Sequence, residues 1–227
     1  EYGHKQPLGG LTEEGNAYYA SATAIIDRFA LTFEYKDYSE FAVRTPAVQY
    51  NNPPTLVREP YYTLPSRHLH ELDSNDEVGY AAIFDGKIWR LTGEVFYAHA
   101  ENHDSENTFD QIWTELEYHN NDETFTTKII NEYRNENDED IITPIIDVLW
   151  EPVWTLFAFN TIGEFQKTDN VNNLYGSFSI TYPPFATVGI EGGKIDDEDF
   201  ARGFADLDII ERTKIRLGFG KRPGGFT

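Results

Sequence analysis

Residues 25–35 read Ile-Ile-Asp-Arg-Phe-Ala-Leu-Thr-Phe-Glu-Tyr, and this stretch decides the fold class. Its large apolar residues return at every second position, and successive side chains of a β-strand point to opposite faces. The stretch therefore predicts one strand with an apolar face and a polar face. The apolar row consists of Ile25, Phe29, Leu31, Phe33 and Tyr35, and Asp27 is its one interruption.

The same alternation recurs along the rest of the chain. We expect some ten or eleven strands, each with its apolar face in a protein core and its polar face in water. The alternation is regular in residues 89–97, 112–118, 177–182 and 207–219. Weaker strand candidates are residues 41–49, 55–64, 78–84, 124–133, 153–159 and 186–191.

Three local signals refine this pattern. The pair Asp85-Gly86 predicts a hairpin turn, because a type I′ turn needs two positive φ angles and these residues tolerate them. Residues 153–159 are apolar at nearly every position, which predicts a strand that is covered on both faces. We expect a short helix over residues 195–206, because the carboxylates of residues 196–199 would lie at its positively polarised N-terminus.

The alternation, the Pro-rich turns and the lack of a βαβ rhythm favour an all-β fold, with a single jelly-roll β-barrel or sandwich of about ten strands as the architecture. We expect three parts: an N-terminal arm over residues 1–15, a jelly-roll domain over residues 16–217, and a C-terminal arm over residues 218–227. Both arms are expected to be flexible, since they contain several Gly and Pro residues.

The composition is strongly acidic. The 227 residues include 39 Asp and Glu against 18 Lys and Arg, a formal net charge of −21, and no Cys. This excludes disulfides and argues against direct nucleic-acid binding, because Lys and Arg must neutralise a phosphate backbone. Such a surface repels itself in dilute buffer, whereas molar salt shortens the Debye length to roughly 3 Å. The composition therefore favours a halophilic protein, with an ordinary acidic protein as the alternative.

Charge is unevenly distributed along the chain. Residues 101–140 hold 13 carboxylates and two basic residues, a net charge of −11 (2 minus 13). Residues 211–227 hold five basic residues and Glu211, a net charge of +4 (5 minus 1). The sequence therefore predicts a molecule with an acidic middle and a basic C-terminal end.

The carboxylates of Glu115 and Glu117 are the first candidate for catalysis. They lie two residues apart on one strand face, and paired carboxylates on a β-strand are how many glycosidases supply an acid and a nucleophile. The glycosidase families that use such a strand motif carry a longer acidic row. A solvated strand face beside the acidic middle explains the pair better.

Histidines are the second candidate. His68 and His70 are spaced to share a strand face, and a His-x-His pair begins some mononuclear metal sites. The upstream Gly and the downstream Glu of such sites are not in place. His99, His103 and His119 would complete a site only if folding brought them together, so exposed or core histidines are the simpler interpretation.

Other motifs are weaker still. The acidic stretches 73–77, 135–140 and 196–199 are rich in oxygen ligands, but none has the spacing of a Ca²⁺ loop. The segment Gly218-x-Gly220-Lys221 lacks the spacer and the Ser or Thr of a phosphate loop. No Gly-x-Ser-x-Gly motif signals a nucleophile. We therefore predict no catalytic, cofactor-binding or metal site, and no enzymatic activity.

Aromatic residues are abundant, with 4 Trp, 14 Tyr and 16 Phe. A large sandwich core explains many of them. Some are candidates for protein interfaces, where aromatic anchors concentrate binding energy. These candidates are Tyr18, Tyr19, Tyr61, Tyr62, Trp150 and Trp154.

Size, acidity, strand pattern and loose ends (residues 1–15 and 218–227) together resemble one family. The chain looks like the larger of the two small major capsid proteins of halophilic archaeal icosahedral viruses with an internal membrane. The resemblance implies a vertical single jelly roll that assembles with a sister single-barrel protein into pseudo-hexameric capsomers. It also implies a virion location, and the basic end over residues 212–222 would face the viral membrane or an acidic neighbour.

The sequence thus predicts a structural virion protein whose partners are copies of itself and the sister capsid protein, with no cofactor, nucleic acid or small-molecule substrate. Two other classes stay open. One is a secreted β-sandwich module that binds carbohydrate, which would be a monomer with an exposed aromatic platform. The other is a β-sandwich glycoside hydrolase that depends on Glu115 or Glu117.

Overall fold

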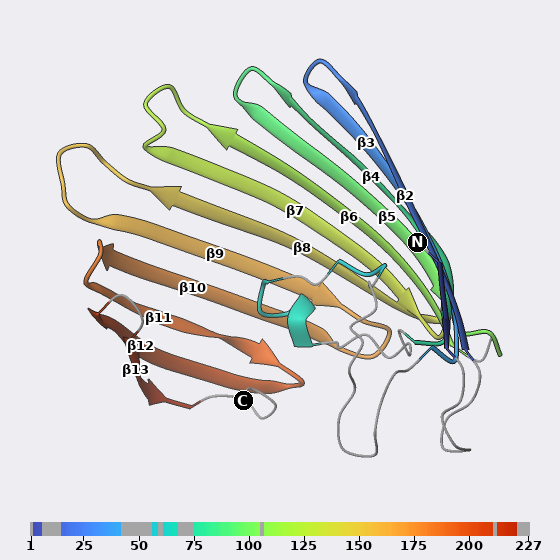
Figure 1. The fold of residues 1–227 in the computed structure, drawn as a ribbon. Helices are drawn as coiled ribbons and strands as arrows, with labels where there is room; N and C mark the ends of the chain where they lie inside the picture. The colour runs from blue at the N-terminus through green and yellow to red at the C-terminus, as the bar shows by residue number, and fades with distance from the viewer. Residues whose placement is uncertain are drawn as a thin grey trace.

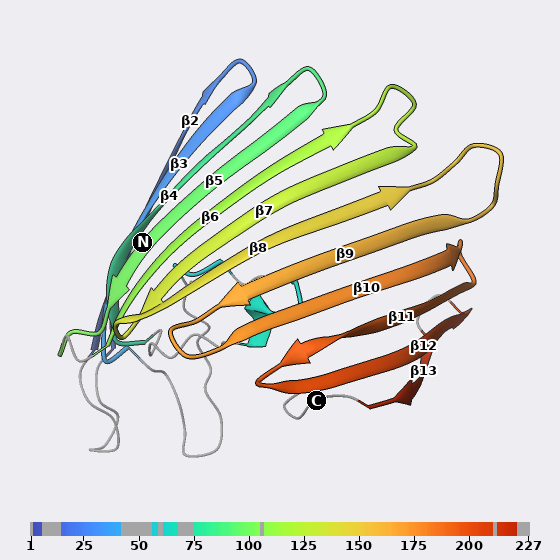
Figure 2. The same ribbon diagram turned by 180° about the vertical axis from the view of Figure 1, so that it is seen from behind.

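The computed structural model describes residues 2–5, 15–41, 56–58, 61–67, 75–104, 107–210 and 213–221, which form one curved antiparallel sheet of 13 strands (Figures 1 and 2). The all-β prediction is confirmed. The strands are β1 (Tyr2–Lys5), β2 (Gly15–Ile26), β3 (Phe29–Ser39), β4 (Glu77–Ile88), β5 (Leu91–Glu101), β6 (Thr108–His119), β7 (Phe125–Glu136), β8 (Glu139–Trp150), β9 (Ala158–Lys167), β10 (Asn172–Tyr182), β11 (Ala186–Ile195), β12 (Glu198–Ile210) and β13 (Thr213–Gly220). The described part of the connection from β3 to β4 contains one 3-10 turn, η1 (Pro65–Arg67).

Every strand pairs with its neighbours in the sequence, so that the sheet order runs from β1 to β13 without a crossover. A jelly roll instead needs Greek-key connections between two packed sheets. The described residues therefore do not confirm the jelly roll, and they contain 13 strands where about ten were predicted. Among these residues no helix is long and apolar enough to cross a bilayer.

Two turns lie elsewhere than the sequence suggested. The stretch from residue 25 to 35 is split by a turn at Asp27 and Arg28, so Ile25 and Phe29 belong to two paired strands. The Asp85-Gly86 pair lies inside β4, and the hairpin turns four residues later, at Trp89 and Arg90. The ladder between β4 and β5 continues through Gly86 to Ile88, and the ring of Phe29 occupies the space where a larger residue at position 86 would place its Cβ.

Two expected elements are also corrected. Residues 151–157 form the exposed connection from β8 to β9 instead of a covered strand, and the side chain of Val153 is 84% exposed. The expected helix over residues 195–206 is strand. Asp196 and Asp197 make the two-residue turn from β11 to β12 with φ angles of 50° and 64°, because short Asp residues tolerate the positive φ values of a type I′ turn.

The sheet has two unlike faces, which the strand register defines. We call the face that η1 packs against the inner face and the opposite one the outer face (Figure 1). The inner face carries buried polar side chains on neighbouring strands. They are Lys36, Glu77, Gln111, Glu132, Arg134, Thr143, Glu164, Gln166, Asn173 and Asp206.

The outer face is apolar and exposed. Among the described strands, Ile25 beside the β2–β3 turn is the one large exposed apolar residue on the inner face. All the others are on the outer face, and they form a continuous band from β1 to β13. They are Tyr2, Tyr18, Ile26, Phe29, Leu31, Phe33, Tyr35, Tyr80, Phe84, Ile88, Leu91, Val95, Ile112, Leu116, Ile129, Ile142, Ile146, Trp150, Phe165, Leu174, Phe178, Tyr182, Val188, Ile190, Leu207, Ile215, Leu217 and Phe219.

The prediction that the apolar faces of the strands form the core is therefore wrong for most of the sheet. Leu31 and Phe33 share one face as expected, but they are 50% and 49% exposed. On the same strand, Lys36 is fully buried beside Glu77. Alternation with period two shows that the two faces differ, and it carries no information about which face is covered.

A smaller apolar core does exist, on the inner face. It forms where residues 56–58 and 61–67 lie against the sheet. These residues include Leu56, Tyr62 and Leu64, all buried. The sheet side chains of the main cluster are Ala81, Phe96, Ala98, Ala100, Phe109, Trp113, Ile130 and Ile145.

The terminal arms lie mostly outside the described residues. Of the N-terminal arm, residues 2–5 form β1 and pair with β2, and residues 6–14 are not described. Of the C-terminal arm, residues 218–220 end β13 and residues 222–227 are not described. The basic end is partly engaged, since Arg216 forms an ion pair with Asp206 at 2.7 Å and Lys221 with Glu198 at 3.6 Å.

Candidate functional site

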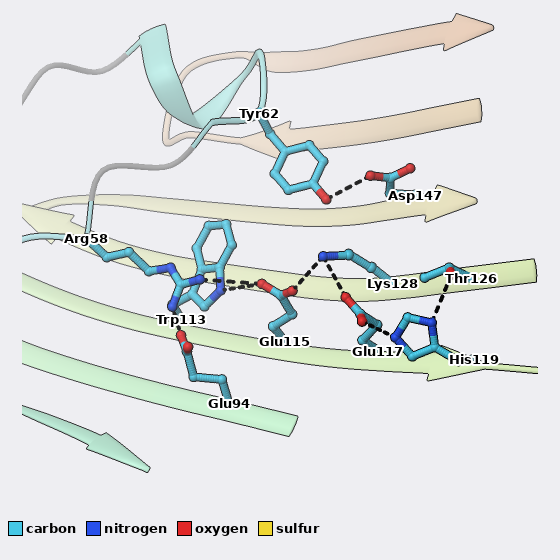
Figure 3. A network of polar contacts seen from close by, with 10 residues as sticks. All are labelled: Arg58, Tyr62, Glu94, Trp113, Glu115, Glu117, His119, Thr126, Lys128 and Asp147. Atoms are coloured by element: carbon cyan, nitrogen blue, oxygen red, sulfur yellow. Dashed lines mark hydrogen bonds and ion pairs between the residues drawn. The ribbon is translucent and has the colours of Figure 1, made fainter. Parts of the chain in front are cut away.

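A row of charged side chains crosses the inner face beside Arg58 and Tyr62 of the connection from β3 to β4 (Figure 3). The register explains why they meet. On the inner face β5, β6 and β7 place Glu94 opposite Glu115, and Glu117 opposite Lys128. Residues directly opposite each other on one face are close enough to pair. Strand pairing alone therefore assembles the row, which we call the inner charge row.

Lys128 lies between the two carboxylates of β6. Its Nζ is 3.3 Å from Glu115 Oε1 and 2.6 Å from Glu117 Oε2. His119 bonds to Glu117 through Nε2, and its Nδ1 lies 3.0 Å from the hydroxyl of Thr126. The row thus runs without interruption from Glu115 to the hydroxyl at the start of β7.

The connection from β3 to β4 adds a second cation. Arg58 forms ion pairs with Glu94 and with Glu115, the latter at 3.5 Å. Its guanidinium also lies 4.7 Å from the centre of the Trp113 ring, a cation–π distance. Arg58 therefore fixes the connection to the sheet by charge and by stacking.

The electrostatics of the row follow from its pairing. Burial alone raises the pKa of Glu117, but hydrogen bonds and charge from Lys128 and His119 outweigh it and lower the pKa below its usual value. Burial alone lowers the pKa of Lys128, and the two glutamates reverse this and raise it. Burial lowers the pKa of Arg58. At neutral pH, the Lys128 and Glu117 pair is therefore ionised.

A second anchor holds η1. Glu164 on β9 accepts hydrogen bonds from the backbone N–H groups of Thr63 and Leu64, at 3.0 and 2.6 Å. Gln166 donates to the carbonyl oxygen of Leu64 at 3.2 Å, and the hydroxyl of Tyr62 donates to Asp147 at 3.1 Å. Side chains of the sheet thus form hydrogen bonds with the backbone N–H and C=O groups of Thr63 and Leu64. Buried backbone groups require such partners.

Glu164 makes the stability of the protein depend on pH. Burial raises the pKa of this carboxyl from 4.5 to about 7, although the two backbone N–H groups act in the opposite direction. Between these values the folded state binds more protons than the unfolded state, so the free energy of unfolding falls as the pH rises, by up to about 1.4 kcal/mol per pH unit. The contribution is complete below about pH 4.5 and lost above about pH 7.

The Glu164→Gln variant removes this titration. We expect denaturant unfolding at pH 5, 6 and 7 to show a smaller fall in stability for the variant than for the parent chain. The matched control is Glu191→Gln, which changes a carboxylate on the same face but not at the η1 anchor. An unchanged slope in Glu164→Gln would contradict the assignment.

Next to η1 lies a cavity of about 370 Å³. Residues 61–66 form one side of it, and the inner faces of β9 to β13 form the other. Its wall carries two ion pairs, between Arg202 and Glu191 at 3.2 Å and between Arg216 and Asp206 at 2.7 Å. Polar side chains of the inner face therefore converge both at this cavity and at the inner charge row.

The sequence placed Glu115 and Glu117 on one strand face, and the structure confirms this. They do not lie on a solvated surface, because their side chains are only 14% and 20% exposed and are held by Arg58, Lys128 and His119. No local sequence pattern pointed to these cations. Lys128 could have been found, because a hairpin centred on residues 120–124 pairs it with Glu117.

The other predicted residues are not brought together. His99 lies on the outer face beside Asp110, whereas His119 lies on the inner face. His103 lies between Asp37 and Asp76. His68 and His70 fall outside the described residues.

The acidic stretches mostly form turns: Asn137 and Asp138 connect β7 to β8, and Asp196 and Asp197 connect β11 to β12. In the first acidic stretch, residues 73–74 are not described, and Glu77 is buried beside Lys36. Within the described ranges, no group of three or more His, Asp or Glu is placed to hold a metal ion.

No family model, curated protein or solved structure matches this chain. Function is therefore argued from the distribution of side chains over the two faces of the sheet. The strongest feature is the reversal of the usual order, with polar groups buried on the inner face and apolar groups exposed on the outer one.

Proposed function

We propose that this chain forms a membrane-spanning β-sheet whose outer face contacts the acyl chains of a lipid bilayer and whose inner face lines a polar interior. The single observation that carries the proposal is the reversed distribution of side chains. Apolar residues such as Phe33 and Ile129 are 49% and 57% exposed, whereas Lys36 and Gln111 on the inner face are fully buried.

Water is a poor solvent for the outer face. Each Å² of apolar surface left in water forgoes about 25 cal/mol of stabilisation, and monomeric soluble proteins rarely expose apolar patches larger than a few hundred Å². The outer band runs from β1 to β13. In a bilayer the apolar outer face would contact apolar acyl chains. Polar side chains are then expected on the opposite face, away from lipid.

The aromatic residues of the outer face have a spacing close to the height of a bilayer's apolar core. On β7, Phe125 and Tyr133 lie about 26 Å apart at about 3.3 Å per residue, with Thr127, Ile129 and Asn131 between them on the same face. The apolar band of membrane β-sheets is about 25 Å tall and is flanked by aromatic residues at both interfaces. Ile129 lies halfway between the two aromatic residues of β7.

Tyrosines mark one edge of the band. They lie at the end of the sheet where the chain passes from β3 to β4, which we call the β3–β4 end, and three of their hydroxyls donate to carboxylates, Tyr35 to Asp37 at 3.4 Å among them. Tyr97 donates to Asp110 at 3.2 Å and Tyr133 to Asp140 at 2.8 Å. An apolar ring with a polar tip suits the membrane–water interface. The tyrosines of this edge are Tyr18, Tyr35, Tyr80, Tyr97 and Tyr133.

Tryptophan and phenylalanine mark the other edge, which we call the β2–β3 end. Trp150 lies 5.4 Å from Phe159 and 6.2 Å from Trp154, measured between ring centres. The exposed connection at residues 151–157 continues this cluster. Its apolar side chains have no covering layer in the described part of the chain, and the interfacial region of a bilayer accommodates them.

The capsid function stays a prediction, as do its sister-protein partner, its virion location and the halophilic habitat. So does the jelly-roll architecture on which the capsid function depends. That function would require a protein layer over the outer face, supplied by neighbouring subunits. The two proposals differ in what covers the band, lipid or protein, and one experiment separates them.

The experiment compares two single-tryptophan proteins reconstituted in liposomes of brominated phosphatidylcholine, since bromine on the acyl chains quenches tryptophan fluorescence by contact. The first keeps Trp113, which is buried on the inner face. The second replaces every native tryptophan by Phe and carries Ile129→Trp on the outer face. We expect strong quenching of the second protein and little of the first.

Equal quenching of the two proteins would contradict the proposal. So would a chain that stays in aqueous solution without detergent and forms salt-dependent oligomers, which is the behaviour that the capsid function predicts. Circular dichroism in liposomes serves as the folding control for both proteins.

A further inference from the structure

The cavity beside η1 has a shape and a lining that the membrane proposal does not use. Its volume of about 370 Å³ lies within the range of small-molecule sites, about 300–1,000 Å³. Five adjacent strands, β9 to β13, supply its wall, and Tyr61, Thr63 and Ser66 cover it. The cavity is therefore built by the main fold and closed by the inserted segment.

Hydroxyl and amide groups dominate the lining. Asn160, Ser177 and Ser179 point into the cavity from β9 and β10, and the covering segment adds the side chains of Thr63 and Ser66. These groups both donate and accept hydrogen bonds. In the part of the chain that the structure describes, the hydroxyl of Ser179 has no recorded partner, so it is available to a ligand.

The charges of the wall are already neutralised. Arg202 pairs with Glu191 at 3.2 Å, and Glu191 also accepts a hydrogen bond from Tyr175 at 3.0 Å. Arg216 makes two bonds of 2.7 Å to Asp206. An anion would have to compete with these internal carboxylates, so the wall favours a neutral ligand.

Aromatic rings complete the lining. Tyr61 is 65% exposed on the covering side, and Phe200 and Phe204 lie on the wall. Gly189 makes room for this arrangement, because a Cβ at that position would lie 2.6 Å from the ring of Phe204. A ligand that fits needs apolar faces for the rings and many hydroxyl groups for the polar side chains.

We propose that this cavity binds a neutral saccharide of one or two sugar rings. A sugar ring has apolar C–H faces and a rim of hydroxyl groups, which match the aromatic and the hydrogen-bonding parts of the lining. The inference concerns the inner face alone and holds whether or not lipid covers the outer face. It departs from the expectation that the chain has no small-molecule ligand.

The experiment is calorimetric titration of the full chain with glucose and maltose, in a detergent without a sugar headgroup so that the detergent does not compete. We expect saturable binding with a Kd of about 1 mM or tighter. Ser179→Val removes a hydroxyl and narrows the cavity, and Tyr61→Ser removes the covering ring. Each variant is expected to weaken binding at least about tenfold.

Thr161→Val is the matched control, because it makes the same loss of a hydroxyl on the outer face of β9. It should bind as the parent does. Tyr61→Ser keeps the test decisive if Ser179→Val does not fold. No binding of either sugar overturns the inference, as does equal weakening by Thr161→Val. Inorganic phosphate and glycine are tested as well. If one of them binds and the sugars do not, the ligand is an anion or a zwitterion, and the saccharide inference is overturned.

Discussion

Replacing Ile129 by arginine is expected to destabilise the membrane-inserted protein by about 2–4 kcal/mol, the cost of an arginine at the middle of a lipid-facing β-sheet. Ile129 is 57% exposed on the outer face of β7, midway between Phe125 and Tyr133. Were this face in water, an exposed Ile→Arg change would alter stability by only about 0.5 kcal/mol in either direction. The substitution therefore discriminates strongly between lipid and water.

The measurement is guanidinium unfolding of the two proteins in liposomes. Asn135→Arg on the same face of β7 is the matched control, because it places the same side chain beside Asp140, beyond the tyrosine edge of the band. The expected cost there is at most about 1 kcal/mol. An Ile129→Arg protein as stable as this control would argue against lipid contact at the middle of the band.

Replacing Arg134 by methionine is expected to cost about 3–5 kcal/mol, because it leaves a buried carboxylate without its cation. Arg134 Nη2 lies 3.0 Å from Glu132 Oε1, and the two side chains are 2% and 1% exposed. Gln111 also donates to this carboxylate at 2.7 Å, but an amide does not neutralise the charge. Denaturant unfolding in detergent micelles measures the loss.

The double variant Arg134→Met with Glu132→Gln is the companion test. It removes both charges, and replacing a whole buried pair costs far less than breaking it. We expect the double variant to recover more than half of the lost stability. If Arg134→Met lowers the free energy of unfolding by less than about 1 kcal/mol, water reaches Glu132. The inner face at β7 would then be accessible to solvent.

The sequence predicted where the strands lie better than it predicted which face of each strand is covered. Residues 177–182 and 112–118 lie within strands as expected, since period-two alternation is a property of the strand itself. Alternation predicts an apolar core only where water covers the polar face, and here the polar face is the covered one. On β6 the polar residues Gln111 and Glu115 flank Trp113 on one face, and the other face carries Asp110 as well as the apolar Ile112 and Leu116, so the composition of the two faces does not tell which one is covered.

The turns and the site depended on partners distant in sequence. Asp85-Gly86 has the composition of a hairpin turn, yet Gly86 lies in β4 opposite Gly93 because the ladder with β5 continues to Ile88. The pairing of Arg58 with Glu115 joins residues from two separate elements across 57 positions. No local pattern predicts such a contact, so the sequence revealed Glu115 but not the cation that holds it.

The two edges of the outer band differ in a way that gives the sheet a direction. Carboxylates gather at the β3–β4 end, whereas Tyr118, Trp150 and Tyr182 mark the opposite end. Carboxylates on a lipid-facing surface lie outside the hydrocarbon core of the bilayer, because burying their charge is costly. Tryptophan is enriched at the membrane–water interface. The membrane proposal therefore predicts that the two leaflets meet unlike rims, with the end of β3 and the start of β4 on the carboxylate side. The carboxylates of this rim are Asp37, Glu101, Asp110, Asp140 and Asp199.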